Sequence, residues 1–293
     1  MKVLFVNPSK WGRGITPIWI ATHSAILKKS GFKVDLFDAT FYSNWTDNEI
    51  GYNTKNNQYK PSKYNEYIKF NDLNIFDELK KKIKEFDPDI IFWSALSSHI
   101  HGEGEYVNFQ YGYELVNEFK GKSLIISGGL QITADVKSMS EKYPLVDIFI
   151  GGESELILNE IAEKYSEVQK NKNTLKDELK KINGISFFNN EKLETNRKQK
   201  IYETLDILPN YDYSLFDDQI FYRAYNGEVL RAIDYEMSRG CIYSCSYCVE
   251  TVIQKYYDFE EITPSGALKS SKAYLRNKNA KKVYEELSSY KKN

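Results

Sequence analysis

Five short apolar segments alternate with helical patterns in the first 168 residues, and this alternation constrains the fold more than any other feature. The apolar segments lie at 2–6, 32–37, 90–93, 123–127 and 146–150. Helical patterns follow them at 17–29, 75–86, 106–119, 133–142 and from Gly151 to 165. Strands alternating with helices indicate a parallel α/β sheet, and continuous apolar strands indicate burial on both faces. We predict a doubly wound parallel sheet.

The loops at the carboxyl ends of such strands are where open α/β sheets bind ligands. Two of these loops carry glycine pairs, which let a bulky ligand approach the backbone closely, although ordinary strand-to-helix turns use the same pairs. The candidate cofactor-binding residues there are Asn7, Ser94, Gly128, Gly129, Gly151, Gly152 and Glu153. Neither a G-x-G-x-x-G dinucleotide motif nor a P-loop is present in the sequence.

All three cysteines lie in one stretch, as Cys241, Cys245 and Cys248, with the spacing C-x3-C-x2-C. Thiolates are preferred ligands of iron–sulfur clusters, and close spacing lets one loop wrap a cluster. Three thiolates on a cluster of four irons leave one iron without a protein ligand. An open metal position is what separates a catalytic site from a closed structural one.

Two other interpretations of the cysteines remain open. Offsets of four and three also place residues on one face of a helix, where free cysteines are common core residues. Gly240, Ser244 and Ser246 argue against a packed helix at this point. Zinc is the second alternative, but it usually takes four Cys and His ligands, and every histidine is far away in sequence.

The cysteine segment resembles the cluster motif of the radical S-adenosylmethionine (SAM) enzymes. Tyr247 supplies the aromatic residue of C-x3-C-x-aromatic-C, and the run from Ser238 to Cys241 strengthens the match. The resemblance implies a [4Fe-4S] cluster on the three cysteines, with SAM on the fourth iron. It also implies that Tyr247 lies against the adenine of SAM through its backbone, and that reduction yields a 5′-deoxyadenosyl radical.

The preceding region resembles the cobalamin-binding domain that comes before many radical SAM domains. The resemblance rests on the order of Asn7-Pro8, Asp87-Pro88-Asp89, Gly128-Gly129 and Gly151-Gly152-Glu153. It implies a flavodoxin-like (Rossmann-like) strand order of 2-1-3-4-5, with the corrin over the carboxyl ends of the strands. The D-x-H-x-x-G motif is absent, which implies cobalt without a histidine ligand from the first loop.

His99 and His101 lie in the loop after the third strand, near the expected ligand face. A pair at this spacing could be a ligand or a proton carrier. A solvated loop is the plainer interpretation.

The rest of the chain divides into a connecting region and a second domain. The residues from Ile182 to Thr195 predict a β-hairpin, and the segments 205–209 and 211–212 resemble the connection to a radical SAM domain. The segment 229–237 predicts the first strand of a (β/α) barrel, with the cysteine loop at its carboxyl end. The predicted domains are a cobalamin-binding domain at 1–168, a linker with the hairpin at 169–225, and the beginning of the radical SAM domain at 226–293.

Such a barrel needs roughly 200 residues, by comparison with the ~250 of a full (β/α)8 barrel. Only about 65 residues follow from Val229 onward. We therefore expect the chain to be an amino-terminal portion of a radical SAM protein, truncated within that domain and incomplete for activity.

Charge and composition limit the partners. The formal net charge is −1, with 40 basic and 41 acidic residues, so no overall field favours nucleic acid. No apolar stretch approaches the ~20 residues that span a bilayer, and no signal peptide is visible. Clustered cysteines without a disulfide framework predict a reducing cytoplasm.

The sequence thus predicts a cobalamin-binding radical SAM enzyme with three cofactors: a [4Fe-4S] cluster, SAM and cobalamin. The family resemblance implies radical methylation or rearrangement of an unknown small-molecule, lipid or natural-product substrate, with flavodoxin or ferredoxin as reductant. Two alternatives remain: a non-catalytic corrinoid-binding module with a remnant cluster site, and a zinc-binding α/β protein.

Overall fold

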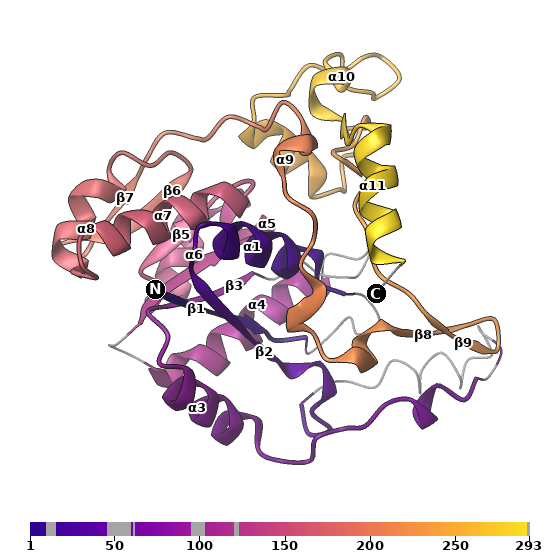
Figure 1. Ribbon diagram of the computed structural model, residues 1–293. Coiled ribbons are helices and arrows are strands. Elements are labelled where there is room, and N and C mark those ends of the chain that lie inside the picture. The colour runs from indigo at the N-terminus through magenta and orange to yellow at the C-terminus, as the bar shows by residue number, and fades with distance from the viewer. Residues whose placement is uncertain (10–15, 46–59, 61, 95–102, 120–122, 292–293) are drawn as a thin grey trace. The chain divides into compact units, whose positions relative to one another are not determined.

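A seven-stranded, mostly parallel sheet is the main feature of the structure, a computed structural model that describes residues 1–9, 16–45, 60, 62–94, 103–119 and 123–291. Its strand order is β2-β1-β3-β4-β5-β6-β7 (Figure 1). The predicted strands are β1 (Lys2–Asn7), β2 (Lys33–Asp38), β3 (Ile90–Ser94), β4 (Leu124–Gly128) and β5 (Ile148–Ile150). The predicted α/β class and the flavodoxin-like order 2-1-3-4-5 are confirmed.

The chain divides into two compact units, which are described separately. Unit 1 comprises Met1–Ala21, Phe32–Ser127 and Tyr213–Asp234. Unit 2 comprises Thr22–Gly31, Gly128–Asp212 and Tyr235–Asn293.

The core of unit 1 forms around β1, which pairs in parallel with β2 on one side and β3 on the other. Phe5 in β1 and Phe92 in β3 are fully buried and meet Trp19 edge to face, with ring centroids 5.9 and 5.6 Å from that of Trp19. The two phenylalanine rings also meet edge to face, at 6.1 Å. Edge-to-face packing adds to the large apolar area that each ring buries. The continuous apolar character of these strands is therefore explained by burial on both sides.

The helices of unit 1 have caps that the sequence specifies. Helix α3 (Ile75–Phe86) begins at Asn74, whose side chain accepts hydrogen bonds from the backbone N–H groups of Phe76 and Asp77. Helix α4 (Glu103–Val116) ends in a 3-10 turn at Asn117–Phe119, earlier than the predicted end of the helix. Helix α1 (Ile18–Lys29) follows Pro17, as predicted; its first turn belongs to unit 1 and the rest, from Thr22, to unit 2. The 3-10 turns of this unit outside α4 are Ala39–Phe41, Tyr64–Glu66, Tyr213–Leu215 and Asp218–Phe221.

Unit 2 contains the end of the sheet and its helices. Strand β5 pairs antiparallel with β6 (Ile185–Asn189), and β6 with β7 (Lys192–Thr195). The predicted hairpin is therefore correct, and it also extends the sheet, which the sequence does not indicate. Helices α7 (Glu155–Glu167) and α8 (Lys172–Leu179) lie between β5 and β6 in the sequence, and a 3-10 turn at Leu205–Ile207 follows β7.

The helix predicted at 133–142 is wrong in its extent. The structure has two helices, α5 (Leu130–Ala134) and α6 (Val136–Lys142), separated at Asp135. Asp135 has non-helical backbone angles, and its side chain accepts a hydrogen bond from the Ser138 N–H as an N-cap. The capping preference of aspartate ends one helix and begins the next.

The strand predicted at 229–237 is also wrong in its extent and pairing. Strand β9 covers only Glu228–Arg231 and pairs antiparallel with β8 (Tyr222–Tyr225) in unit 1. Asn226 and Gly227 join them with positive φ angles of 50° and 90°. Asn-Gly is the preferred two-residue hairpin turn, and this local signal decides the pairing.

The remaining elements belong to unit 2. Strand β10 (Ser238–Arg239) pairs antiparallel with β11 (Arg276–Asn277), and the cysteine loop lies between β10 and α9 (Glu250–Tyr256). Two helices follow α9, namely α10 (Ser271–Tyr274) and α11 (Ala280–Tyr290). No helix in the described ranges is both long and apolar enough to cross a membrane.

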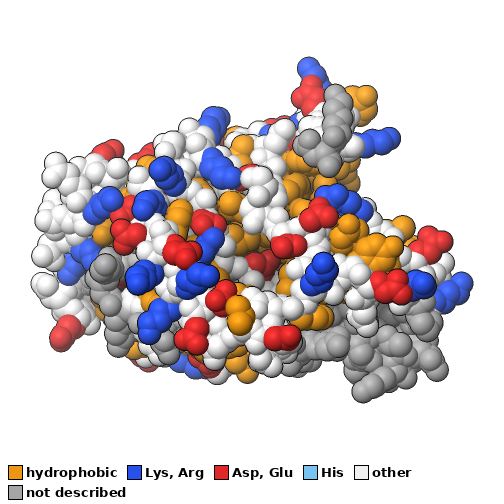
Figure 2. Space-filling view, turned by 60° about the horizontal axis from the view of Figure 1, so that its bottom comes forward, with side chains coloured by type: hydrophobic (Ala, Val, Ile, Leu, Met, Phe, Trp, Pro, Cys, Tyr) orange, Lys and Arg blue, Asp and Glu red, His pale blue; other side chains and the backbone are white. Residues whose placement is uncertain are grey.

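Basic and acidic side chains are intermixed on the face shown in Figure 2. This distribution agrees with the nearly balanced composition of 40 basic and 41 acidic residues. A single-sign patch of the kind that attracts a polyanion is not visible on this face.

The packing of α4 on β3 predicts the effect of one substitution. A Cβ at Gly112 in α4 would overlap the indole of the buried Trp93 in β3. Alanine in a helix gains about 1 kcal/mol over glycine, whereas overpacking a core costs about 1–3 kcal/mol. We expect Gly112→Ala to lower the free energy of unfolding measured in urea, although alanine has the higher helix propensity. Gln110→Ala, on an exposed position of α4, should stay within about 0.5 kcal/mol of the parent chain. A Gly112→Ala protein as stable as that control would contradict the packing.

Candidate functional site

The three cysteines lie in a loop of unit 2 and are free and partly exposed. The segment 241–248 has no helical residues. Cys241, Cys245 and Cys248 therefore do not share a helix face, which excludes the interpretation as a core helix. The backbone N–H of Cys248 donates to the carbonyl of Cys245 at 3.0 Å, so the last two cysteines are held in one turn just before α9.

Three free thiols in one partly exposed loop are a donor set that suits an iron–sulfur cluster. Within the described residues, however, no three His, Cys, Asp or Glu side chains are grouped closely enough to hold a metal ion. The cysteines are thus close in sequence, while their side chains do not converge. Tyr247, the aromatic residue of the motif, is 90% exposed and free to contact another molecule.

The backbone of the cysteine loop is supported by a neighbouring segment. The Ser244 N–H donates to the carbonyl of Gly266 at 3.0 Å, and the Leu268 N–H donates to the carbonyl of Ile242 at 2.8 Å. Gly240 has a φ of 103°, and a Cβ there would overlap the backbone carbonyl of Tyr274. Glycine is required at the entrance to the loop, since any other residue would be strained and would meet backbone atoms.

Arg239, two residues before the first cysteine, is the centre of a buried cluster of carboxylates. Its Nη1 donates to Glu153 Oε1 at 2.9 Å, and its Nη2 donates to Glu155 Oε1 at 2.7 Å. Its Nε and Nη2 also donate to the two carboxylate oxygens of Glu236 at 2.9 and 2.8 Å. The planar guanidinium fork suits this multiple pairing, which a lysine would not reproduce.

Arg276 brings a second positive charge to Glu153. Its Nη1 donates to Glu153 Oε1 and Oε2 at 2.8 and 3.0 Å. Arg239 and Arg276 are direct partners in the β10–β11 pair, which explains why both reach the same carboxylate. The Glu153 side chain is 8% exposed, so this interaction takes place largely out of water.

The charges in this cluster change the pKa values of two of its members. Burial alone would raise the pKa of Glu155, but the Arg239 charge, His23 and the Arg239 hydrogen bond together lower it below its usual range. Burial opposes the charge on Arg239, yet Glu155 and Glu236 hold its pKa well above its ordinary value. Glu155 and Arg239 therefore both stay ionised at neutral pH.

The loop at Gly151–Glu153 contacts protein groups of the segment that follows the cysteines. A Cβ at Gly151 would lie 3.0 Å from the Tyr256 hydroxyl, and one at Gly152 would overlap the Tyr257 hydroxyl. The Glu153 N–H donates to the Tyr257 hydroxyl at 2.7 Å. The glycine pair thus allows close approach of α9 and the residue after it, and the Glu153 carboxylate is occupied by two arginines. The resemblance includes Arg239 in its Ser-Arg-Gly-Cys run, but nothing in the sequence connects Arg239 or Arg276 with Glu153.

The other predicted residues lie at the ends of strands. Gly129, with a φ of 117°, is the N-cap of α5. A Cβ at Gly128 would meet its neighbours only at ordinary van der Waals distances, so the position does not require glycine. In unit 1, Ser94 is buried at the end of β3, and the buried Asn7 donates from Nδ2 to Asp38 Oδ1 at 2.8 Å. His99 and His101 lie outside the described residues.

Asp38 is a further polar residue at the carboxyl end of β2, which sequence reasoning missed. Its Oδ1 accepts hydrogen bonds from Asn7 and Thr40, while its buried Oδ2 has no hydrogen-bond partner among the residues that the structure describes. Burial raises the pKa of this carboxyl group despite those hydrogen bonds. A protonated Asp38 could donate a hydrogen bond at this end of the sheet.

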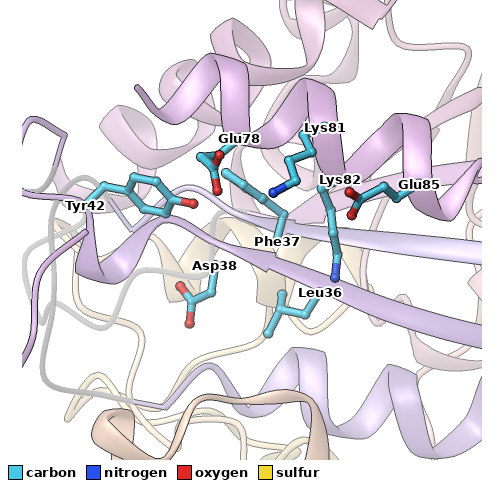
Figure 3. Close-up of a pocket in the computed structure, with 8 residues that line it drawn as sticks. All are labelled: Leu36, Phe37, Asp38, Tyr42, Glu78, Lys81, Lys82 and Glu85. Carbon is cyan, nitrogen blue, oxygen red and sulfur yellow. The ribbon is translucent and has the colours of Figure 1, made fainter. Parts of the chain in front are cut away.

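A cavity of about 260 Å³ lies beside β2 in unit 1. Its lining residues are Leu36, Phe37, Asp38, Tyr42, Glu78, Lys81, Lys82 and Glu85. Figure 3 shows Phe37 directed toward α3, with Asp38 on the opposite side of the strand. The charges of the lining are mixed, and Lys82 is paired with Asp35 at 2.5 Å, so the cavity does not select a ligand of one charge.

Removing the charge of Glu153 should strongly destabilise unit 2. Glu153→Gln removes the acidic partner of the buried Arg276 and one of the three carboxylates around Arg239. Breaking a buried pair costs about 3–5 kcal/mol. Glu167→Gln removes an exposed carboxylate that pairs with Lys164 at 2.7 Å, and it should cost no more than about 1 kcal/mol. Urea unfolding of both variants measures the difference. Equal losses would show that the Glu153 cluster contributes no more than a surface pair.

Matches to known proteins have low sequence identity but extend over most of this chain. No protein-family model matches the chain. The chain is 21% identical over 255 residues to the anaerobic magnesium-protoporphyrin IX monomethyl ester cyclase of Cereibacter sphaeroides, which covers 85% of this chain and 34% of that protein. It is 24% identical over 173 residues to an uncharacterized methyltransferase of Pyrococcus horikoshii, covering 59% and 34%. The chain thus spans about a third of the length of these curated relatives.

Two solved enzymes have a similar fold. The radical SAM methyltransferase TsrM from Kitasatospora setae, solved with a tryptophan substrate and a SAM analogue, matches 98% of this chain and 45% of its own at a TM-score of 0.55 and 18% identity. The cobalamin-dependent SAM radical enzyme OxsB, solved with aqua-cobalamin, matches 99% of this chain and 31% of its own at a TM-score of 0.58 and 16% identity. The predicted resemblance to cobalamin-binding radical SAM proteins is therefore confirmed at the level of the fold, which the chain shares with both solved enzymes.

Proposed function

We propose that this chain binds a [4Fe-4S] cluster through Cys241, Cys245 and Cys248, and SAM at the iron that they leave open. The observation that carries the proposal is the set of three free, partly exposed thiols with C-x3-C-x2-C spacing in one non-helical loop. The fold shared with radical SAM enzymes supports it. The proposed reaction class is radical methylation or rearrangement of a small-molecule, lipid or natural-product substrate.

The chemistry that such a cluster supplies is reductive cleavage of SAM to a 5′-deoxyadenosyl radical, while the protein supplies binding and orientation. Gly240 permits the turn that leads from β10 into the loop. Arg239 fixes the position of that turn through three carboxylates. Tyr247 is proposed to lie against the adenine of SAM mainly through its backbone, since it lies between Cys245 and Cys248 in the same loop.

Cobalamin is the proposed third cofactor, at the carboxyl ends of the parallel strands. OxsB was solved with aqua-cobalamin bound, and TsrM was also solved with cobalamin and a [4Fe-4S] cluster bound. Asn7, Ser94, Gly128 and Gly129 are the proposed contacts. The segment Gly151–Glu153 is also proposed to contact cobalamin, through its backbone and not through the Glu153 carboxylate, which already pairs with arginines.

The proposed domains are those that the resemblance implies: 1–168 for cobalamin, 169–225 as a connection, and 226–293 as the start of the radical SAM domain. Flavodoxin or ferredoxin is the proposed reductant, and the cytoplasm is the proposed location. Three clustered, partly exposed cysteines that form no disulfide framework favour a reducing compartment.

Anaerobic reconstitution with iron and sulfide tests the cluster. We expect brown protein with about four irons per chain, and loss of most of that iron in Cys241→Ala, Cys245→Ala and Cys248→Ala. Ser246→Ala, at an exposed position between two of the cysteines, is the matched control and should keep its iron. Binding of zinc at about one ion per chain, without iron, would instead support a zinc protein.

Retention of hydroxocobalamin through gel filtration tests the second cofactor. We expect the chain to retain it both with and without the three cysteines, because the proposed cobalamin contacts lie outside the cysteine loop. Retention by the triple Cys→Ala variant together with an iron-free parent chain would favour the corrinoid-binding module. A parent chain that releases all cobalamin would remove cobalamin from the proposal.

A further inference from the structure

Gln254 in α9 is a buried polar residue with an unusual set of partners. It lies six residues after the last cysteine and is 1% exposed. A side-chain amide transferred from water into such a site costs free energy unless its groups are hydrogen-bonded. The hydrogen-bond partners of the Gln254 side chain therefore indicate which part of the structure it stabilises.

All side-chain hydrogen bonds of Gln254 go to the first half of the cysteine loop. Its Nε2 donates to the carbonyl of Cys241 at 3.2 Å and to the carbonyl of Tyr243 at 2.9 Å. Its Oε1 accepts from the Ser244 hydroxyl at 2.7 Å. One amide thus uses two donors and one acceptor on three residues of the segment 241–244.

The Gln254 contacts and those of the segment 266–268 bind different backbone groups of the cysteine loop. The segment 266–268 binds the backbone of Ile242 and Ser244, and it leaves the carbonyls of Cys241 and Tyr243 to Gln254. The three thiols are not used in either set of contacts. The backbone is therefore held without these contacts engaging the thiols, and the Cys241 Sγ accepts one hydrogen bond from the Tyr243 N–H, at 3.4 Å.

The chemistry of the contacts selects glutamine. Glutamate at this position would lose both donors and direct a negative charge at two carbonyl oxygens. Methionine has a similar length and helix propensity but would leave the two carbonyls and the Ser244 hydroxyl without these partners. Only an amide of this length matches two acceptors and one donor.

We propose that Gln254 is a positioning residue that sets the backbone conformation of the cysteine loop before a cluster is bound. The proposal rests on the iron–sulfur site proposed above. Gln254 acts through the backbone of Cys241 and its neighbours, and it does not itself bind iron. Outer partners of metal ligands are worth roughly 10–100-fold in metal affinity.

The first experiment uses the metal-free chain, so that it does not depend on the cluster. Hydrogen exchange of the Ser244 and Leu268 amides reports how firmly the loop is held. We expect these amides to exchange about tenfold faster in Gln254→Met, which corresponds to a loss of about 1.4 kcal/mol in the free energy of opening the loop. We expect a larger increase in the exchange rate in Gln254→Glu. Lys255→Ala, at the exposed neighbouring position of α9, is the control and should exchange like the parent chain.

The second experiment measures iron release from the reconstituted chain to a chelator. We expect release roughly 10–100-fold faster in Gln254→Met, with a thermal midpoint close to that of Lys255→Ala. Ser244→Ala removes one partner with a smaller structural change. Its effect and that of Gln254→Met should be less than additive, because both remove the same hydrogen bond.

The outcomes separate this inference from the proposed function. Exchange and iron release equal to those of Lys255→Ala would overturn the role of Gln254. A large drop in the thermal midpoint with faster exchange throughout unit 2 would also overturn it, because Gln254 would then be a general core residue. A parent chain that binds no iron, combined with faster exchange in Gln254→Met, would disprove the cluster and still support the positioning of the loop.

Discussion

The pairing of Glu153 with Arg239 and Arg276 is the interaction on which the structure around the cysteines depends. It connects the loop after β5 to both strands that flank the cysteine segment. The two arginines lie on adjacent strands, so a single buried carboxylate neutralises part of both charges. Because the carboxylate comes from a residue far away in sequence, the cysteine loop has a defined place in unit 2.

The glycines next in sequence to Glu153 and Arg239 are explained by this interaction. Gly152 leaves room for the Tyr257 hydroxyl, which accepts the hydrogen bond of the Glu153 N–H. Gly240 leaves room for the carbonyl of Tyr274, directly after Arg239. Both glycines have positive φ angles, of 75° and 103°, that other residues rarely adopt. Close approach of backbone segments, rather than flexibility, is their role in the structure.

The sequence predicts β1, β3, β4 and β5 well because each is a short run of mainly apolar residues that is almost wholly buried. It fails at β9, where the local Asn226-Gly227 turn overrides an apolar pattern, and at Asp135, where an N-cap divides a helix. It marks Glu153 as a ligand contact because the residue lies in a loop at the carboxyl end of a parallel strand, within the Gly-Gly-Glu run of the family resemblance. The pairing with Arg276 cannot be read from the sequence, since it depends on the register of two strands that are only two residues long.

The segment from Arg276 to Lys278 shows how the cysteine region is held with few apolar contacts. Positions two apart on an extended chain share a face. Arg276 pairs with Glu153, and Lys278 pairs at 2.8 Å with Glu286, which is buried in α11. The Lys278 ammonium also lies 4.2 and 4.6 Å from the ring centroids of Tyr211 and Tyr235.

Buried ion pairs add little net stability compared with apolar packing, but breaking one is costly. Met237, Tyr243, Tyr247 and Ile262 are exposed near the cysteines, so apolar burial alone does not define the conformation there. The two buried cations have different acidic partners and are not interchangeable, because a guanidinium fork and an ammonium bind differently. The charges therefore act mainly to specify one arrangement of the cysteine segment, and its free energy of folding comes from elsewhere in the unit.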